Sequence, residues 1–165
     1  MSFFEGAYTR KQWIKAVNFA AIFGTIGVLT PNILTHPLQI LMLFPYAIIV
    51  GFLISWVFIS PVLLFAMQRP ASYVRAGTYG GISAALVAIL GFALAESNRW
   101  HVRNSSFTHN QIGGGDYIRE IDGFVTPYGW QIIIQNNAAF VILGIAVGLL
   151  LRWIIGPGRN INNAP

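Results

Sequence analysis

The sequence IIIQNNAAFVILG, residues 132–144, lies within an apolar stretch that runs from about Trp130 to Ile155. Such a stretch is long enough for a transmembrane α-helix, which needs about 20 mostly apolar residues. Three consecutive amides, Gln135, Asn136 and Asn137, interrupt it. In a membrane each amide costs free energy unless it finds a hydrogen-bonding partner. The stretch therefore predicts a membrane-spanning helix whose polar residues need an explanation.

The composition supports a membrane location for the whole chain. Of its 165 residues, 55% are hydrophobic and only 9% are charged, whereas a typical soluble domain is about 25% charged. Cysteine is absent, which excludes disulfides, thiolate catalysis and cysteine-ligated metals. The net charge of +5 comes from basic residues that do not cluster on a soluble face, so no nucleic-acid partner is expected.

Three further stretches qualify as spans. We predict an all-α integral membrane protein formed by a single four-helix transmembrane domain, with spans at about 16–34, 38–67, 76–95 and 130–155. The second stretch would be about 45 Å long as a straight helix, which exceeds the hydrocarbon thickness of about 30 Å. It must therefore tilt or bend, and Pro45 or Pro61 is the expected bend.

The distribution of charge predicts the orientation. Seven of the ten basic residues fall on one side of the predicted spans, and three fall in the polar segment 96–126. The positive-inside rule then places both termini in the cytoplasm and segment 96–126 on the outer side. The expected location is the bacterial inner membrane.

The outer segment is expected to be ordered. Asp122-Gly123 is a preferred type I′ turn between two apolar arms, which predicts a short β-hairpin lying over the helices. Thr126-Pro127 is a typical N-cap and first residue of the helix that follows.

Small residues recur at four-residue spacing in each predicted span, and this spacing lets membrane helices approach closely. The stripes either join the four helices or dock onto another protein, and we favour the first. The candidate packing glycines are Gly24, Gly51, Gly77, Gly81, Gly144 and Gly148.

Several polar or aromatic residues are candidates for contact with partners or lipids. Gln131 and Gln135 are four residues apart and share a helix face, whereas Gln135, Asn136 and Asn137 span about 200° and cannot share one. These amides form a collar beneath the outer loop, either as interfacial groups or as a contact for a lipid headgroup or another chain. The indole N–H of Trp56 needs an acceptor or a partner surface, and we expect it to pack among the helices.

Charged residues near the outer loop raise two further questions. Arg99 and Arg103 form either a solvated helix end or a docking surface for an acidic partner. His101 and His109 are weak metal-ligand candidates, but they lack a ligand spacing such as i, i+4, and we expect ordinary surface histidines. No motif implies a cofactor, and a lipid or pigment at the helix surface is left open.

No Asp, Glu, Lys, Arg or His lies near the centre of any predicted span. Such groups mark proton relays, ion pathways and catalytic sites in membranes. We therefore expect no enzyme but a non-catalytic accessory subunit of a larger membrane complex, of bioenergetic type, in contact with lipids and other integral membrane subunits. The alternative is a small oligomeric transporter or channel with a polar path along the spans. A third hypothesis is an outer-face enzyme or metal site that uses the loop histidines. The residues of that polar path would be Asn18, Thr25, Ser55, Ser83 and Gln135.

Overall fold

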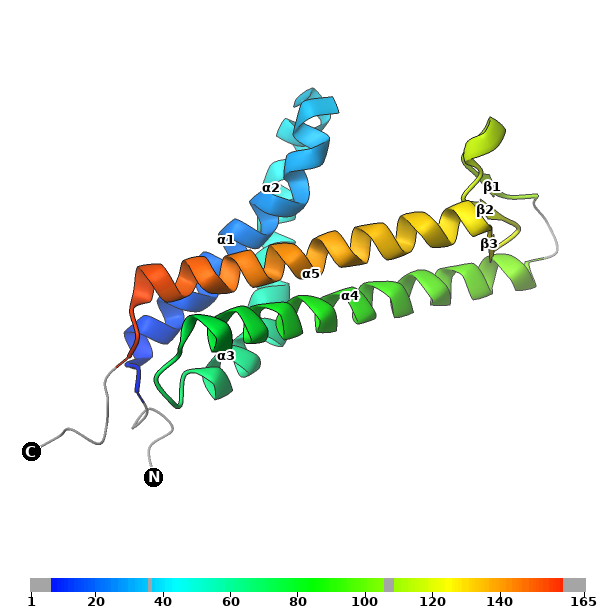
Figure 1. Ribbon diagram of the computed structural model, residues 1–165. Coiled ribbons are helices and arrows are strands. Elements are labelled where there is room, and N and C mark those ends of the chain that lie inside the picture. Colours follow the sequence, from blue (N-terminus) through cyan, green and yellow to red (C-terminus); the bar gives the residue numbers. More distant parts are fainter. Residues whose placement is uncertain (1–6, 36, 106–108, 159–165) are drawn as a thin grey trace, which may run out of the picture. The chain divides into compact units, whose positions relative to one another are not determined.

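The computed structural model describes residues 7–35, 37–105 and 109–158 (Figure 1). Most of these residues are helical. The chain divides into two compact units, which are described separately: unit 1 contains Met1–Ala84 and Val141–Pro165, and unit 2 contains Ala85–Phe140. Two long helices, α4 (Tyr73–Asn104) and α5 (Pro127–Ile155), contribute to both units.

In unit 1, helix α1 (Arg10–Thr35) begins with a reciprocal cap. The backbone N–H of Gln12 donates to Thr9 Oγ1 at 3.3 Å, and the Thr9 N–H donates to Gln12 Oε1 at 2.8 Å. This capping box satisfies two N–H groups that the first helical turn leaves without partners. Small side chains of α1 then form a buried stripe that includes Ala16, Ala20 and Thr25.

Helix α2 (Pro37–Ile54) packs against α1. The two helices come close at Gly51, because this residue has no Cβ and Thr25 Oγ1 occupies the space that a Cβ would need. A π-helical turn (Ser55–Ile59) and helix α3 (Ser60–Ala66) continue the same helical run. Pro61 has no N–H to donate to the preceding turn. The N–H of the residue before it, Ser60, donates to the carbonyl of Ser55, five residues earlier, as in a π-helix. Of the two expected bends, Pro45 lies inside α2 without ending it, and the helical register changes beside Pro61.

The unit 1 parts of α4 and α5 approach closely at glycines. Added Cβ atoms at Gly144 and Gly148 would overlap the α4 backbone at Gly80 and Ala76, respectively, while Gly77 and Gly81 face side chains of α5. Gly24 differs from this predicted pattern, because a Cβ there would meet no atom within 4 Å in the described part of the chain. On α1 the close contact lies instead at Gly27, which faces the Leu143 side chain.

One end of unit 1 joins segments that are distant in sequence. The Tyr8 hydroxyl donates to the Gly156 carbonyl at 3.1 Å and accepts from the Ala71 N–H at 3.3 Å. The Arg152 Nε donates to the Ala71 carbonyl at 2.5 Å, and the Ala7 N–H donates to the Gln68 carbonyl at 3.4 Å. The segment before α1, the α3–α4 connection and the end of α5 therefore lie together.

In unit 2, α4 continues to Asn104, so the first nine residues of the segment predicted as a loop, 96–104, are helical. The following segment contains three two-residue strands, β1 (Gln111–Ile112), β2 (Glu120–Ile121) and β3 (Phe124–Val125), which form an antiparallel sheet in the order β1-β2-β3. Between β1 and β2 lies a short 3₁₀ turn, Gly115–Tyr117. Asp122 and Gly123 connect β2 to β3 with φ values of 50° and 79°, and positive φ at both central residues is the geometry of a type I′ turn.

Three helical segments among the described residues are long and apolar enough to cross a membrane: Met42–Ala66, Tyr73–Asn104 and Pro127–Ile155. The coarse prediction of a mostly helical chain with apolar spanning helices is thereby confirmed. Helix α1 is not among these three segments, so the predicted fourth span stays a prediction.

Candidate functional site

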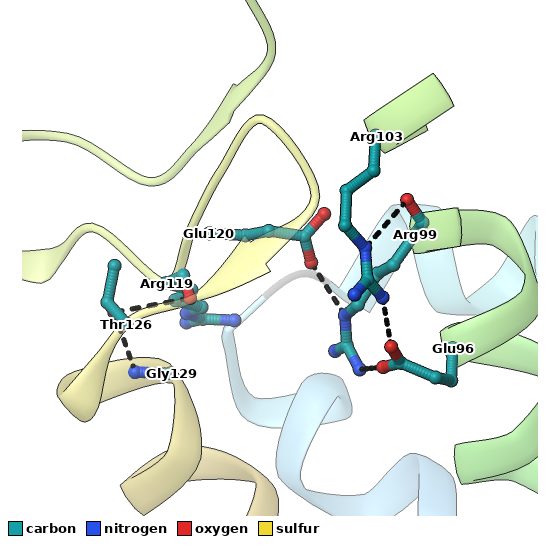
Figure 2. Close-up of polar contacts among 7 residues, drawn as sticks. All are labelled: Glu96, Arg99, Arg103, Arg119, Glu120, Thr126 and Gly129. Carbon is teal, nitrogen blue, oxygen red and sulfur yellow. Dashed lines mark hydrogen bonds and ion pairs between the residues drawn. The ribbon is translucent and has the colours of Figure 1, made fainter. Parts of the chain in front are cut away.

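The most polar constellation of unit 2 joins the end of α4 to the small sheet (Figure 2). Arg99 lies between two carboxylates: its Nε contacts Glu120 Oε2 at 2.8 Å and its Nη1 contacts Glu96 Oε2 at 3.2 Å. Arg103 Nη2 binds the other oxygen of Glu96. Because residues 96, 99 and 103 follow the i, i+3, i+7 pattern, they share one face of α4. We name Glu96, Arg99, Arg103 and Glu120 the ionic clamp.

Burial differs within the ionic clamp. The side chains of Arg99 and Glu120 are only 13% and 11% exposed, whereas Glu96 is 41% exposed. A charge withdrawn from water needs a partner, and the Arg99–Glu120 pair supplies one across 21 residues of sequence. Both predicted arginines are therefore bound to carboxylates of the same chain, and their use as a docking surface for an acidic partner stays a prediction. Arg103 also lies over the Phe124 ring at 5.4 Å.

A second polar joint connects the sheet to the start of α5. Thr126 Oγ1 accepts a hydrogen bond from the Gly129 N–H at 3.0 Å and donates to the Ile118 carbonyl at 2.5 Å. The first of these bonds is an N-cap contact. Gly129 is buried, and a Cβ there would collide with the Arg119 carbonyl, so the sheet backbone lies directly on the first turn of α5 (Figure 2).

Asp122 organises the turn end of the sheet. Its Oδ1 accepts from the Asn110 N–H at 2.9 Å, and its Oδ2 lies 3.1 Å from His109 Nδ1. The pKa of the Asp122 carboxyl is lowered mainly by the hydrogen bond from the Asn110 N–H and to a smaller extent by His109, because both stabilise the charged form. His109 is otherwise fully exposed.

The other predicted metal candidate, His101, packs edge-on against Trp100 with a ring separation of 5.3 Å. Within the described ranges, no group of three or more His, Asp or Glu side chains is arranged to hold a metal ion. The two histidines therefore lie in separate local contacts, one with a ring and the other with a carboxylate.

Among the amides of the collar on α5, Asn137 has a side-chain hydrogen bond within the described part of the chain. Asn137 is half-buried, and its Nδ2 donates to the Ile133 carbonyl at 2.8 Å. Gln131, Gln135 and Asn136 are exposed. The three consecutive amides, Gln135, Asn136 and Asn137, point in directions about 100° apart along α5 and do not share one face.

Trp56 belongs to unit 1 and is 39% exposed. Its ring meets the Trp13 ring edge-on at 5.4 Å, and Trp13 Nε1 donates to the Ser60 carbonyl at 3.4 Å. Trp56 is thus partly packed against α1 and partly open to the surroundings. The buried Ser83 hydroxyl of the alternative polar path donates to the Tyr79 carbonyl at 2.8 Å, which directs it to its own helix.

Sequence reasoning missed Glu120, Gly129 and Tyr8. A buried arginine needs a carboxylate, but the sequence does not say which acid meets Arg99. Gly129 follows Thr126 by three residues, which is the N3 position of a capped helix, and this spacing signals the cap without signalling the close approach. No motif marks Tyr8, whose role depends entirely on tertiary contacts.

Comparison with known proteins finds a relative that aligns with much of the chain. No family model matches the chain, and no solved structure matches it. Inner membrane protein YjgN of Salmonella typhimurium (strain LT2) is 30% identical over 122 residues, an alignment that covers 71% of this chain. The chain spans 30% of the length of that relative.

The relative and the helices agree on the environment of the chain. YjgN is by its name an inner membrane protein, and three described helical segments are apolar enough to cross a membrane. The chain is therefore an integral membrane protein that contacts lipids, as its composition predicts.

Proposed function

We propose that the chain is a non-catalytic component of a membrane protein complex in a bacterial inner membrane. In this proposal four helices span the membrane, both termini are cytoplasmic, and the small sheet with its ionic clamp is a rigid outer cap. The amide collar of α5 would contact a neighbouring integral membrane subunit.

The exposed collar carries the proposal. Gln131, Gln135 and Asn136 lie on a helix that is otherwise strongly apolar, and their side chains are exposed. An exposed amide in or near hydrocarbon is costly, and a polar group of a neighbouring helix would remove that cost. Asn137 illustrates the alternative solution, since it bonds to its own helix.

The chemistry of the ionic clamp supports a structural rather than a catalytic role. Glu96 and Glu120 are both bound to arginines of the same chain, and Asp122 is bound to a backbone N–H and a histidine. A general acid or base must reach a substrate atom, whereas Glu120 already connects the sheet to α4, Glu96 binds arginines of its own helix, and Asp122 connects parts of the sheet segment.

The joined end of unit 1 supports the proposed topology. Tyr8, Ala71 and Gly156 are linked by hydrogen bonds, so they belong on one side of a membrane. An even number of crossings must then separate Tyr8 from Ala71. If α1 crosses in one direction and the run α2–α3 returns, this condition is met.

Purification of the tagged full-length chain from its own membrane in mild detergent, followed by mass spectrometry of the co-purifying proteins, tests the proposal. We expect specific membrane subunits to co-purify, and to be lost from the double variant Gln135→Leu/Asn136→Leu. Asn98→Leu is the matched control because Asn98 is an exposed amide on α4. It should leave the complex intact.

Two outcomes would overturn the proposal. One is a monodisperse 18.2 kDa species with no partner. The other is solute flux in liposomes containing the pure chain, abolished by Gln135→Leu, which would establish the transporter alternative.

A further inference from the structure

Unit 1 contains an apolar groove of about 410 Å³ between the first turns of α4 and the last turns of α5. Thr78 at its edge turns its hydroxyl to the Val74 carbonyl at 2.9 Å, so the groove presents mainly hydrocarbon. Its principal lining residues are Tyr73, Val74, Gly77, Gly81, Ile145 and Leu149.

Glycine creates the groove. The α4 and α5 backbones approach at Gly80, Gly144 and Gly148, which brings the helix axes close together. Gly77 and Gly81 then present no side chain to fill the space beside this contact. From Tyr73 to Ile82 the groove follows α4 for about 13 Å, close to half the hydrocarbon thickness of about 30 Å. Its length therefore matches one leaflet of a bilayer.

One end of the groove is cationic. Arg152 follows Ile145 and Leu149 at the i, i+4, i+7 positions of one α5 face, and its guanidinium lies 4.8 Å from the centre of the Tyr73 ring. Arg75, two residues after Tyr73 on α4, adds a second positive charge at the same level of the helix, but its guanidinium lies over the Tyr79 ring at 5.8 Å and outside the groove lining. Among the described residues of unit 1 there is no Asp or Glu, and no carboxylate pairs with either arginine.

We propose that this groove binds one acyl chain of an anionic phospholipid, that Arg152 binds its phosphate, and that Arg75 adds positive charge at the same level of α4. The apolar wall binds the acyl chain, the Arg152 guanidinium binds the negatively charged phosphate, and Tyr73 lies where these two regions meet. Arginine suits this role because its planar group donates several hydrogen bonds to phosphate oxygens. The site requires a bilayer but no partner subunit, so it stands apart from the function proposed above.

Native mass spectrometry of the purified full-length chain tests the headgroup. The protein is titrated with phosphatidylglycerol or with phosphatidylcholine of the same acyl chains. We expect tighter retention of one phosphatidylglycerol, weakened about fivefold by Arg152→Gln and to a smaller extent by Arg75→Gln. Arg119→Gln, which neutralises an exposed arginine of unit 2, should change nothing.

Because Arg152 also holds the Ala71 carbonyl, its loss could affect folding. Arg152→Lys keeps the charge and should bind the lipid more tightly than Arg152→Gln does. Arg75→Gln gives a second, independent measurement. Equal retention of the two lipids, or equal binding by the parent and both glutamine variants, would overturn the proposal.

A phosphatidylglycerol with a photoactivatable acyl chain tests the groove itself. We expect adducts on residues 73–82 and 145–149, and their loss in Val74→Trp, which fills the groove. Leu94→Trp is the matched control, because Leu94 is an exposed apolar residue of α4 in unit 2. Adducts spread evenly over the helices, or a crosslinked second copy of the chain in the groove, would contradict the proposed occupant.

Discussion

Gly129 is a residue of unit 2 at which the backbone leaves no room for a side chain. A Cβ there would overlap the Arg119 carbonyl and the Val125 side chain, and backbone atoms cannot move aside as a flexible side chain can. We expect Gly129→Ala to separate the sheet from α5 and to destabilise the protein by about 1–3 kcal/mol, as overpacking does. Thermal unfolding in detergent, followed by tryptophan fluorescence, measures this loss.

Gly91→Ala is the matched control for this prediction. Gly91 lies in α4 within the same unit, and a Cβ there would meet nothing within 4 Å. Replacing a helical glycine by alanine removes backbone freedom from the unfolded chain, so this variant should equal the parent or gain up to about 1 kcal/mol. Equal losses in both variants would show that helix interior glycines, rather than the Gly129 contact, limit stability.

The Arg99–Glu120 pair is expected to carry most of the strength of the ionic clamp. Both side chains are largely buried, and removing one partner leaves a buried charge without its hydrogen bond, which costs about 1–3 kcal/mol. A double-mutant cycle with Arg99→Met and Glu120→Gln should therefore give clear coupling in thermal unfolding. The exposed His109–Asp122 pair should give little coupling, and less at high salt. Coupling that is no larger for the buried pair would contradict the structural role of the clamp.

At the element scale, the pKa of Asp122 makes the sheet sensitive to acid. The Asn110 N–H and His109 lower the folded-state pKa of this carboxyl, so its stabilising contribution is complete above the unfolded pKa of about 3.9. The contribution is lost as the pH falls through the folded value. We expect hydrogen exchange at the Asn110 amide, corrected for intrinsic rates, to lose protection over this acid range.

Two comparisons isolate the effect of the carboxyl. Asp122→Asn keeps an oxygen acceptor, and asparagine tolerates positive φ, but it does not titrate, so its Asn110 protection should be independent of pH. The Thr126 N–H, which donates to the Arg119 carbonyl at 3.0 Å, has no titrating partner and should keep its protection in the parent. If both amides lose protection together, the acid effect is general unfolding.

The elements differ in how far sequence predicts them. Long apolar stretches are local signals, so the helical course of α2–α3, α4 and α5 follows from composition. The predicted end of the third span at Ala95 marks where the chain turns polar, but the helix continues to Asn104. Hydropathy indicates which residues face hydrocarbon or water, but it does not indicate where the helical backbone ends. Glu96, Arg99 and Arg103 stabilise the polar end of the helix through contacts at i, i+3 and i+7.

Contacts between elements were less predictable. Four-residue spacing selected Gly77 and Gly81 on α4, but Gly80 makes the closest backbone approach to α5. The choice depends on how each helix is rotated about its axis, which spacing within one helix cannot determine. For the same reason the sequence did not identify Glu120 as the buried partner of Arg99, since that pairing requires the docked sheet.

At the scale of the whole molecule, charge divides along the chain as the two units do. The sequence of Ala85–Phe140 contains three arginines and four of the five acidic residues, whereas the remainder contains seven of the ten basic residues. In the proposed topology the basic set faces the cytoplasm, as the positive-inside rule requires. The anionic-lipid groove would then open to the cytoplasmic leaflet, where Arg75 and Arg152 lie.

The absence of cysteine from the chain allows this topology to be tested with single cysteines and a membrane-impermeant maleimide. Gln111→Cys should react in intact spheroplasts, whereas Lys11→Cys and Gln68→Cys should react only after permeabilisation; all three positions are exposed. Ser83→Cys, at a buried position, should react in neither case. The parent, which has no cysteine, measures the background labelling.

Reaction of Lys11→Cys from outside with Gln68→Cys protected would mean that α1 does not cross, leaving three spans. Reaction of both from outside, with Gln111→Cys protected, would keep the even number of crossings between them and reverse the orientation, because the hydrogen bonds of Tyr8 constrain only which ends lie together.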